Sequence, residues 1–365
     1  PPRSTLFPYT TLFRSKFMDS DGIFLGREEN EKLWFMADNH TFRYADCEIQ
    51  ELDYIGEKAC EYHIDSVLSL PFVSENIQAV QNRKFRVVLD AVNASGSFII
   101  RELLEQMGCE VLPLFCDGSG VFPHTPEPLP ENLSQLSGMV ADTNADIGIA
   151  VDPDADRLVL TDNTGKPIGE EKTVSIAIDA VLSNINYFTN FTYSGVVVNL
   201  STTRLTRDIA DKHGADYYLS PVGEINVVKL MKKKNAIIGG EGSGGVIFPI
   251  CHYGRDSLAG IALVLTYLAS TGRTLGALND TYKSYEIVKK KLSKPESMEM
   301  ALSKIKAKYA QYNINTEDGI RIDFPDSWIQ LRASNTEPVI RIIAEAADSE
   351  KAIAMIDELK EVCGI

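Results

Sequence analysis

The amino-acid sequence predicts repeated α/β domains followed by an α+β domain at the C-terminus. Short apolar, β-branched stretches of strand length recur at residues 85–92, 147–151, 195–200 and 236–238. Stretches with helical periodicity lie between them, at residues 98–107, 132–141 and 203–213. Alternating strands and helices are typical of largely parallel sheets whose faces are covered by the helices.

The rhythm changes near Leu275, and the rest of the chain has a different order of elements. A lysine-rich stretch of helical character continues to Ala310. Three strand-like stretches follow, at residues 320–324, 328–332 and 339–344. A final amphipathic helix is expected at residues 349–362. This order predicts a separate α+β domain.

The composition disfavours several classes of protein. The 365 residues include 36 Lys and Arg against 51 Asp and Glu, a formal net charge of −15. Such a charge opposes binding to nucleic acids and anionic membranes, although a few arginines in one site can still bind a small anion. The longest apolar stretch, residues 258–269, is shorter than the ~20 residues that span a bilayer. Six scattered cysteines without CxxC or zinc-like Cys/His spacing favour reduced thiols and a cytoplasmic protein.

The first fifteen residues are expected to be a non-native tail. They read PPRSTLFPYTTLFRS, without an initiator Met and without the basic and apolar regions of a signal peptide. Residues 5–15 resemble the translation of a widely used DNA-sequencing adapter, so they are excluded from fold reasoning. The alternative is a native N-terminal strand.

An acidic loop follows the second strand-like stretch directly. Asp152, Asp154 and Asp156 alternate in DPDADR, so their carboxylates can converge on a hard cation such as Mg²⁺. Ligands of α/β proteins commonly bind at this end of a strand. An EF-hand is excluded, because its sixth position would be Arg157 and its twelfth Asn163. A solvated acidic turn stays an alternative, and Arg157 could either hold a phosphate or neutralise Asp156.

A glycine-rich segment, GGEGSGG at residues 239–245, satisfies the GxGxxG pattern of dinucleotide sites. That pattern requires a helix at the loop, whereas VIFP follows here, so an NAD-dependent oxidoreductase is disfavoured. No lysine follows the last glycine, so this is not a Walker loop either. We expect a flexible loop that presents Glu241 and Ser243 to sugar hydroxyls.

A third polar loop, RASNTEP, lies between two strand-like stretches of the last domain. Arg332 offers a bidentate donor, and the polar side chains and turn amides after it can bind a phosphate dianion. An ordinary polar turn is the alternative. A cation site, a polyol site and a phosphate site together indicate phosphoryl chemistry on a sugar phosphate.

These three loops resemble, in order and separation, the motifs of the α-D-phosphohexomutases. Further stretches resemble the same family: LDAVNASGS at 89–97, FPHTPEPLPENL at 122–133, PVGEINV at 221–227 and HYGRDSLAGIAL at 252–263. The resemblance covers nearly everything from Lys16 onward and implies α/β domains with mixed sheets around a central cleft. The implied segments are a tail at 1–15, part of domain I at 16–55, domain II at 56–165, domain III at 166–275 and domain IV at 276–365.

The resemblance also implies a role for each loop. Mg²⁺ would be bound by three carboxylates, those of Asp152, Asp154 and Asp156. The transferring phosphoryl group would face two catalytic residues, Arg157 and a candidate general acid/base, Lys16. The sugar would be held by Gly223, Glu224, Glu241 and Ser243. The phosphate that does not react would be held by Arg332, Ser334, Asn335 and Thr336.

Two departures from the family accompany the resemblance. Gly245 stands where many members carry His, so a proton-transfer role at that position is absent. The phosphoserine loop, of TASHNP type, is also missing, since Ser15 lacks the His-Asn-Pro context. Enzymes accelerate phosphate-monoester hydrolysis by up to ~10²¹, so this chemistry is extremely slow without the nucleophile. The chain as written is therefore expected to be inactive as a mutase.

The substrate implied by the resemblance is a hexose phosphate, interconverted between 6- and 1-phosphate through a hexose 1,6-bisphosphate. GEGSGG together with VGEINV resembles a variant found in some phosphoglucosamine mutases and in dual phosphoglucomutase/phosphomannomutases. Glucosamine phosphate is favoured, since Glu224 could attract a 2-ammonium group. The alternatives are glucose or mannose phosphate, or a Mg²⁺-dependent sugar-phosphate binder without catalysis.

Overall fold

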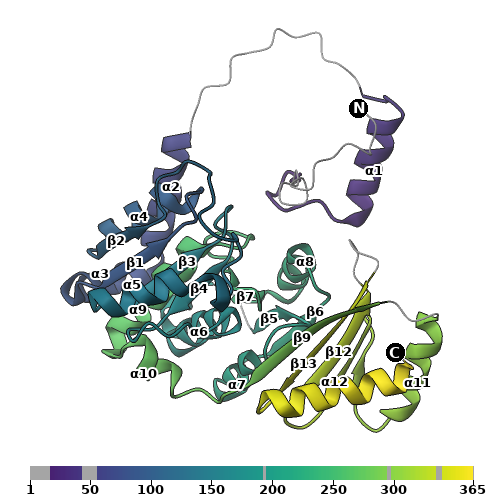
Figure 1. Ribbon diagram of the computed structural model, residues 1–365. Coiled ribbons are helices and arrows are strands. Elements are labelled where there is room, and N and C mark those ends of the chain that lie inside the picture. Colours follow the sequence, from purple (N-terminus) through teal and green to yellow (C-terminus); the bar gives the residue numbers. More distant parts are fainter. Residues whose placement is uncertain (1–16, 43–55, 192–194, 294–296, 334–338, 365) are drawn as a thin grey trace. The chain divides into compact units, whose positions relative to one another are not determined.

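The computed structural model describes residues 17–42, 56–191, 195–293, 297–333 and 339–364 (Figure 1). The chain divides into two units, Pro1–Ile55 and Gly56–Ile365. In the first unit, a bridge between Met18 and Phe24 precedes helix α1 (Arg27–Asp38), none of whose residues is buried. The expected tail lies outside the described residues, as does Lys16, so both stay predictions.

The second unit begins with two helices, and the first of its three sheets follows them. Its first two helices are α2 (Gly56–Leu68) and α3 (Pro71–Arg83), and the helices of the first sheet are α4 (Gly96–Gln106), η3 (Pro130–Asn132) and α5 (Ser134–Thr143). The strands are β1 (Arg86–Asp90), β2 (Glu110–Leu114), β3 (Ile147–Val151) and β4 (Leu158–Thr161). They are ordered β2-β1-β3-β4, parallel except for the antiparallel pairing of β4 with β3. The mixed sheet expected from the resemblance is therefore confirmed.

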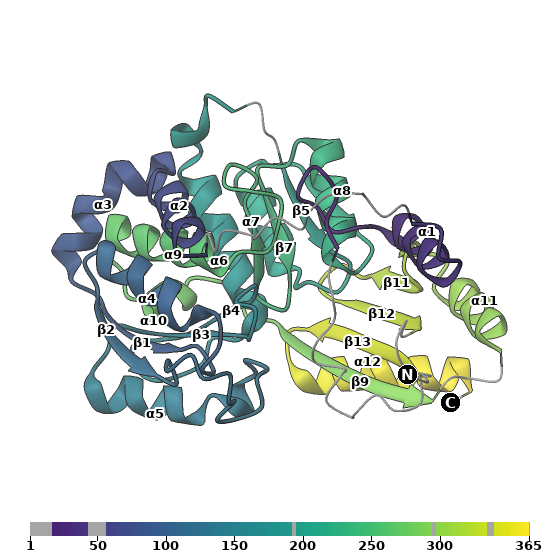
Figure 2. The same cartoon turned by 90° about the horizontal axis from the view of Figure 1, so that it is seen from above.

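Helices cover both faces of this sheet, because successive residues of its strands point to opposite sides. Val88 and Ala150 pack against α5 with Val140, whereas Val87 and Ile149 join the main core on the other face. Figure 2 shows α5 on one side of the sheet and α4 on the other. Nearly continuous burial of β3 follows from this double cover.

The second sheet repeats the first in topology. Its strands are β5 (Val196–Asn199), β6 (Tyr217–Ser220), β7 (Ile238–Glu241) and β8 (Gly245–Ile247), ordered β6-β5-β7-β8 with only the β7–β8 pair antiparallel. The helices are α6 (Glu170–Ser183), η4 (Ile185–Phe188), α7 (Leu205–Lys212), α8 (Glu224–Lys234), α9 (Ser257–Thr271) and α10 (Leu275–Asn279). The predicted repetition of α/β domains is confirmed.

Helix α9 accounts for the long apolar stretch of the sequence. All its residues from Ser257 to Leu268 are buried, and it packs against α3 and α6. A helix that is apolar on every side is stable in a folded domain when other elements of the protein bury it on all sides. No helix among the described residues is both long and apolar enough to cross a membrane.

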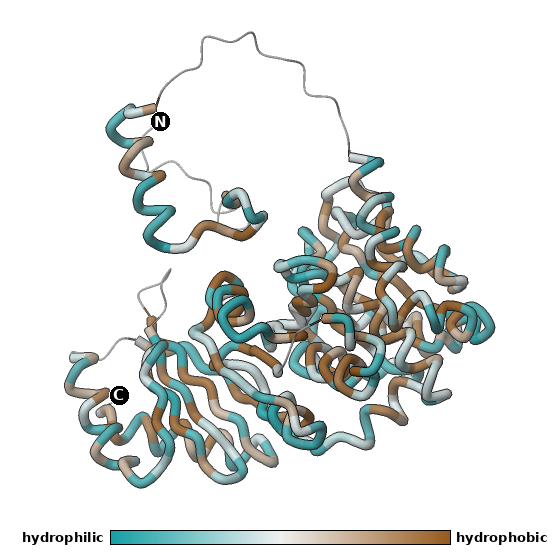
Figure 3. The backbone as a smooth tube through the Cα atoms, turned by 180° about the vertical axis from the view of Figure 1, so that it is seen from behind, coloured by the Kyte–Doolittle hydropathy of each residue, from teal (hydrophilic) through white to brown (hydrophobic). Residues whose placement is uncertain are grey.

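The third sheet is antiparallel and forms the predicted α+β region. Its strands are β9 (Glu286–Ser293), β10 (Asn313–Asn315), β11 (Ile320–Asp323), β12 (Trp328–Ala333) and β13 (Val339–Ala346), ordered β10-β11-β12-β13-β9. Helices α11 (Met298–Lys308) and α12 (Ser349–Cys363) pack on one face of it, and Figure 3 shows apolar and polar residues alternating along its strands. The lysine-rich stretch predicted as helical thus contains β9, whose pairing with β13 overrides the helix propensity of its three lysines.

Polar contacts join the third sheet to the second. Ser201 Oγ donates to Gln330 Oε1 at 2.6 Å, and the amide of Val222 donates to Asp318 Oδ2 at 3.1 Å. Thr203 donates to the buried Glu345, which also accepts from Trp328 Nε1 at 2.6 Å. These contacts bring the start of the RASNTEP segment toward the strands that carry the glycine-rich segment. The domain boundaries expected from the sequence stay a prediction.

Candidate active site

The acidic loop, residues 152–157, connects β3 to β4 at the carboxyl end of β3. A turn closes it, since the amide of Ala155 donates to the carbonyl of Asp152 at 3.0 Å. Two serines from other helices fix it: Ser95 Oγ donates to the Pro153 carbonyl and Ser257 Oγ to the Ala155 carbonyl, both at 2.7 Å. The loop is therefore held in shape by protein contacts on both sides.

The three carboxylates predicted to bind a cation are brought together by this loop. Asp152 is buried, Asp156 is half-buried and Asp154 is exposed, and one oxygen from each lies within 4.8 Å of the others. Burial, reinforced by the nearby Asp156, raises the pKa of Asp152 to about 6. Three convergent oxygen ligands at a partly open site fit a hard divalent cation such as Mg²⁺.

Arg157 lies within ion-pair distance of Asp156, as the sequence suggested, and forms a shorter contact with Asp152. Its Nε donates to Asp152 Oδ2 at 2.6 Å and lies 3.9 Å from Asp156 Oδ1. Its side chain keeps 23% of its surface exposed, so the guanidinium borders solvent beside the acidic loop. It is placed to bind an anion that approaches a cation in this loop.

The glycine-rich segment is a tight hairpin rather than the flexible loop expected. Strand β7 runs to Glu241, the turn is closed by the amide of Gly244 donating to the Glu241 carbonyl at 3.1 Å, and β8 begins at Gly245. Gly244 has φ +92°, and a Cβ there would lie 2.3 Å from the Leu158 carbonyl oxygen, so a side chain does not fit. No helix begins at this segment, which excludes the dinucleotide-binding arrangement.

Glu241 ends β7 as a buried carboxylate with fixed partners. Its Oε1 accepts from Asn199 Nδ2 at 2.8 Å and from the Gly223 amide at 3.1 Å. Its Oε2 lies 3.2 Å from Arg255 Nη1. Ser243 is half-buried at the turn of the same hairpin. The two predicted sugar-binding side chains thus come from one rigid turn, with the Gly223 backbone beside it.

Arg255 is the central cation of the site, and the sequence analysis did not single it out. Its Nη2 lies 2.5 Å from Asp156 Oδ2, and its Nε lies 3.1 Å from Glu224 Oε2. With Glu241 it therefore joins three segments through three ion pairs. An isolated β-bridge between Ile247 and Arg255 places Arg255 beside the hairpin. No local sequence pattern predicts this contact.

Gly245 makes room for this arginine. A Cβ at Gly245 would lie 2.3 Å from Arg255 Cδ and 2.9 Å from its Cγ. Gly245 is therefore coupled to Arg255, whose side chain fills the space beside it.

Glu224 begins α8 directly after Gly223, whose φ of +117° favours glycine. The Glu224 carboxylate accepts from the backbone amide and the Nε of Arg255, each at 3.1 Å. It lies in the predicted pocket, but its first role in this structure is to orient Arg255.

Arg332 lies near the end of β12, opposite Arg341 on β13. Burial and the charge of Arg341 lower the pKa of Arg332, and its buried Nε has no hydrogen-bond partner among the described residues. Like charges directly opposite each other on antiparallel strands are unfavourable, and the carboxylates of Asp318 and Glu241 partly offset the charge of Arg332. Arg341 lies beside Arg332 on the sheet. Ser334, Asn335 and Thr336 lie outside the described residues.

Comparisons with known proteins agree with this geometry. Family models match three parts of the chain: phosphoglucomutase/phosphomannomutase alpha/beta/alpha domain II at residues 61–165, alpha/beta/alpha domain III at 170–285 and the C-terminal domain at 287–362. A phosphoglucomutase/phosphomannomutase of Thermococcus kodakarensis is 33% identical over 92% of this chain and 72% of its own length. A probable phosphoglucosamine mutase of Methanopyrus kandleri is 30% identical over 95% and 75%.

Solved structures show the same fold. A phosphoglucomutase/phosphomannomutase family protein from Burkholderia thailandensis superposes with a TM-score of 0.77 at 24% identity, covering 93% of this chain and 70% of that one. The family models together match most of the chain, and the curated relatives match at 30% identity or more. The chain therefore belongs to the phosphoglucomutase/phosphomannomutase family, the α-D-phosphohexomutases.

Proposed function

We propose that this chain forms the Mg²⁺ and sugar-phosphate sites of a phosphohexomutase, an isomerase that interconverts hexose 6-phosphate and hexose 1-phosphate through a hexose 1,6-bisphosphate. One observation carries the proposal: Arg255 ties the acidic loop, at Asp156, to the sugar hairpin, at Glu241. A cation site and a polyol site in direct contact suit a phosphorylated sugar better than either ligand alone.

Each group has a distinct task in this proposal. When bound by the acidic loop, Mg²⁺ would offset charge on the transferring phosphoryl oxygens. Arg157 would contact the same phosphoryl group with its half-buried guanidinium, and Glu241 would accept hydrogen bonds from sugar hydroxyls, with Ser243 beside it. Arg332 would hold the other phosphate with its guanidinium, beside Arg341 at the facing position of β13.

For the 365 residues as printed we propose binding without turnover, because no residue stands in the His-Asn-Pro context of the donor serine. Scattered cysteines, five of them free among the described residues, support the cytoplasm as the site of action. Neighbouring structures support the ligand class: Aspergillus fumigatus N-acetylphosphoglucosamine mutases were solved with GlcNAc-6P and magnesium and, as S69A, with glucose 1,6-bisphosphate.

Glucosamine phosphate remains the favoured substrate, and glucose or mannose phosphate is the second candidate. The second is favoured by one contact: Arg255 already occupies both oxygens of Glu224, which leaves that carboxylate less available to a 2-ammonium group. Relatives with both kinds of name match the chain.

Calorimetry tests the proposal. We expect glucosamine 6-phosphate to bind in the presence of Mg²⁺, and Arg332→Ala to weaken it about 100-fold because a charge-assisted bidentate contact is lost. Arg207→Ala is the matched control, since Arg207 is exposed and pairs only weakly with Asp211 at 3.7 Å. Equal affinity of wild type and Arg332→Ala would reject the phosphate site, and product in a coupled assay with glucose 1,6-bisphosphate would reject binding without turnover.

A further inference from the structure

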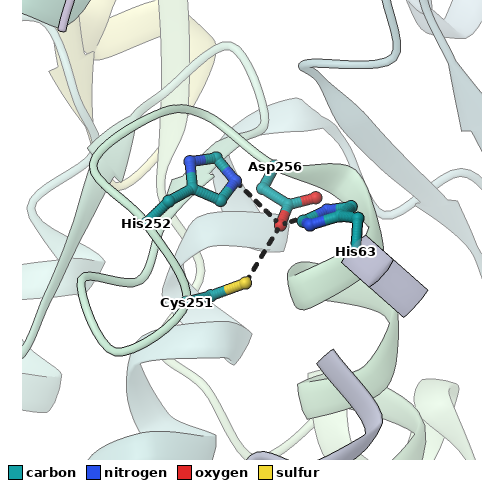
Figure 4. A group of neighbouring side chains, drawn as sticks. All are labelled: His63, Cys251, His252 and Asp256. Carbon is teal, nitrogen blue, oxygen red and sulfur yellow. Dashed lines mark hydrogen bonds and ion pairs between the residues drawn. The ribbon is translucent and has the colours of Figure 1, made fainter. Parts of the chain in front are cut away.

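A second group of metal-binding side chains lies outside the site described above. His63 comes from α2, Cys251 and His252 come from the turn after β8, and Asp256 is the residue before α9 (Figure 4). One ligand atom from each lies within 4.8 Å of the others. We call these four residues the His–Cys–Asp cluster.

Three of these side chains converge on one carboxylate oxygen of the fourth, Asp256. Asp256 Oδ2 lies 3.1 Å from His63 Nε2, 3.2 Å from His252 Nε2 and 3.9 Å from Cys251 Sγ. The other oxygen, Oδ1, accepts from the Leu258 amide at 2.8 Å, which fixes the carboxylate at the start of α9. Asp256 itself is 5% exposed. Three donors therefore compete for the lone pairs of one buried oxygen.

These separations are close to those of ligands around one small metal ion. Tetrahedral Zn²⁺ has bonds of about 2.0–2.3 Å, which places its ligand atoms about 3.3–3.6 Å apart. The two imidazole nitrogens already lie near that distance from the carboxylate oxygen, and the sulfur needs a shift of a few tenths of an ångström. The histidine side chains are 27% and 42% exposed, so an ion can enter from solvent.

The donor set also defines the chemistry of the ion. Two imidazole nitrogens, one thiolate and one carboxylate suit Zn²⁺, whereas Mg²⁺ requires oxygen ligands. Neutral imidazoles with one thiolate and one carboxylate carry two negative charges, which one divalent ion balances. On binding, the Cys251 thiol gives its proton to solvent, each neutral imidazole carries its proton on Nδ1 instead of Nε2, and four metal–ligand bonds replace the hydrogen bonds to Asp256.

We propose that His63, Cys251, His252 and Asp256 bind one structural Zn²⁺ that fastens α2 to the turn carrying Arg255. Four protein ligands fill a tetrahedral shell, which is typical of a structural zinc site. Asp256 follows Arg255 directly in the chain, so the ion would hold the segment that orients the central arginine. The proposal does not depend on the mutase function.

Cobalt substitution tests this site, because Co²⁺ takes the same ligands and reports on them by colour. The 365-residue chain, freed of metal with a chelator, is titrated with Co²⁺ in excess Mg²⁺ so that the acidic loop is occupied. We expect a thiolate-to-cobalt absorption band that saturates at one ion per chain and disappears when Zn²⁺ is added. Absence of the band at stoichiometric Co²⁺ would overturn the proposal.

Two serine variants separate the cluster from other thiols. Cys251→Ser should abolish the thiolate band, whereas Cys60→Ser should keep it, since Cys60 is a free thiol one turn before His63 on the same helix. A band that survives in Cys251→Ser contradicts the site. Should Cys251→Ser fail to fold by circular dichroism, His63→Gln provides the test: we expect Co²⁺ affinity to fall at least ~10-fold, and unchanged affinity rejects the site.

Discussion

The acidic loop and the His–Cys–Asp cluster both contact the N-terminal end of helix α9, but the charge of their carboxylates is balanced in different ways. Ser257 of α9 donates to the acidic loop, and Asp256, one residue earlier, is the centre of the cluster. The loop's buried carboxylates are balanced by arginines, Asp152 by Arg157 and Asp156 by Arg255. In the cluster, imidazole and thiol groups contact a single carboxylate. A site balanced by arginines suits a hard cation with an anionic substrate, whereas one built from imidazoles, a thiol and a single carboxylate suits a borderline metal ion alone.

The largest expected effect comes from replacing Arg255, which balances the carboxylates of the candidate active site. Arg255→Met leaves Asp156, Glu224 and Glu241 without their shared cation, and breaking buried ion pairs costs about 3–5 kcal/mol. We expect the free energy of unfolding in urea to fall by about that amount. Arg207→Met, at an exposed position, should change it by less than ~0.5 kcal/mol.

That variant also separates the two regions, since Co²⁺ binding by the folded Arg255→Met chain should persist at the His–Cys–Asp cluster. A loss of stability below ~1 kcal/mol would show that the three ion pairs of Arg255 do not organise the site.

The second prediction removes one ligand from the acidic loop. Asp154→Asn is expected to weaken Mg²⁺ binding about 100-fold, because one of three carboxylate ligands is lost while the exposed position tolerates the change. Calorimetric titration with Mg²⁺ measures the effect, and Asp142→Asn on the exposed face of α5 controls for the lost charge. Co²⁺ uptake by the cluster should stay unchanged. Mg²⁺ affinity equal to wild type would mean that Asp154 is not a ligand.

The third prediction concerns the space that Gly245 leaves for Arg255. Gly245→Ala places a Cβ 2.3 Å from Arg255 Cδ, so the side chain must shift away from its three carboxylates. We expect a loss of about 1–3 kcal/mol in the free energy of unfolding. Gly138→Ala is the control, because a Cβ there meets nothing within 4 Å in helix α5 and should stabilise by up to ~1 kcal/mol. A harmless Gly245→Ala would show that Arg255 has room to move.

Local sequence patterns predicted the strands that are buried on both faces, because such strands consist mainly of apolar residues. Strands β3 and β5 are buried along their whole length, and the sequence shows them as short apolar runs, broken in β5 only by its last residue, Asn199. The sequence analysis missed β2, an edge strand that contains Pro113, and placed β9 in a helical stretch. Both are held by pairing with another strand, β2 with the preceding strand β1 and β9 with the more distant β13.

The two candidate metal-binding regions also differ in how far apart their ligands lie in the sequence. Asp152, Asp154 and Asp156 lie within five residues, so their convergence could be predicted from spacing. His63 is far from Cys251 in the sequence, and no Cys/His spacing connects them; only the packing of α2 beside α9 does. Arg255 and Arg341 were missed for a related reason, because each becomes important through strand pairing, as a partner of Ile247 and Arg332.

The smallest expected effect concerns Glu171, a half-buried carboxylate that lies against Gly242 of the sugar hairpin. Burial, opposed by Lys289 and reinforced by Glu170, raises the pKa of Glu171 to about 8 from its ordinary value near 4.5. Between these two pH values the folded chain holds a proton that the unfolded chain has released, so the free energy of unfolding falls as pH rises through this window. Glu171→Gln cannot titrate and should remove that slope.

Urea unfolding at pH 5.5 and pH 8 therefore separates protonation from ion pairing at this position. Between pH 5.5 and pH 8 the variant should gain about 1–3 kcal/mol relative to wild type, because only the wild type loses proton-linked stability in this window. Glu102→Gln, on the exposed face of α4, controls for the loss of one charge. If the variant instead gains no stability relative to wild type over this range, the ion pair with Lys289, at 3.2 Å, outweighs the cost of burial. Glu171 would then resemble the arginine-balanced acidic loop.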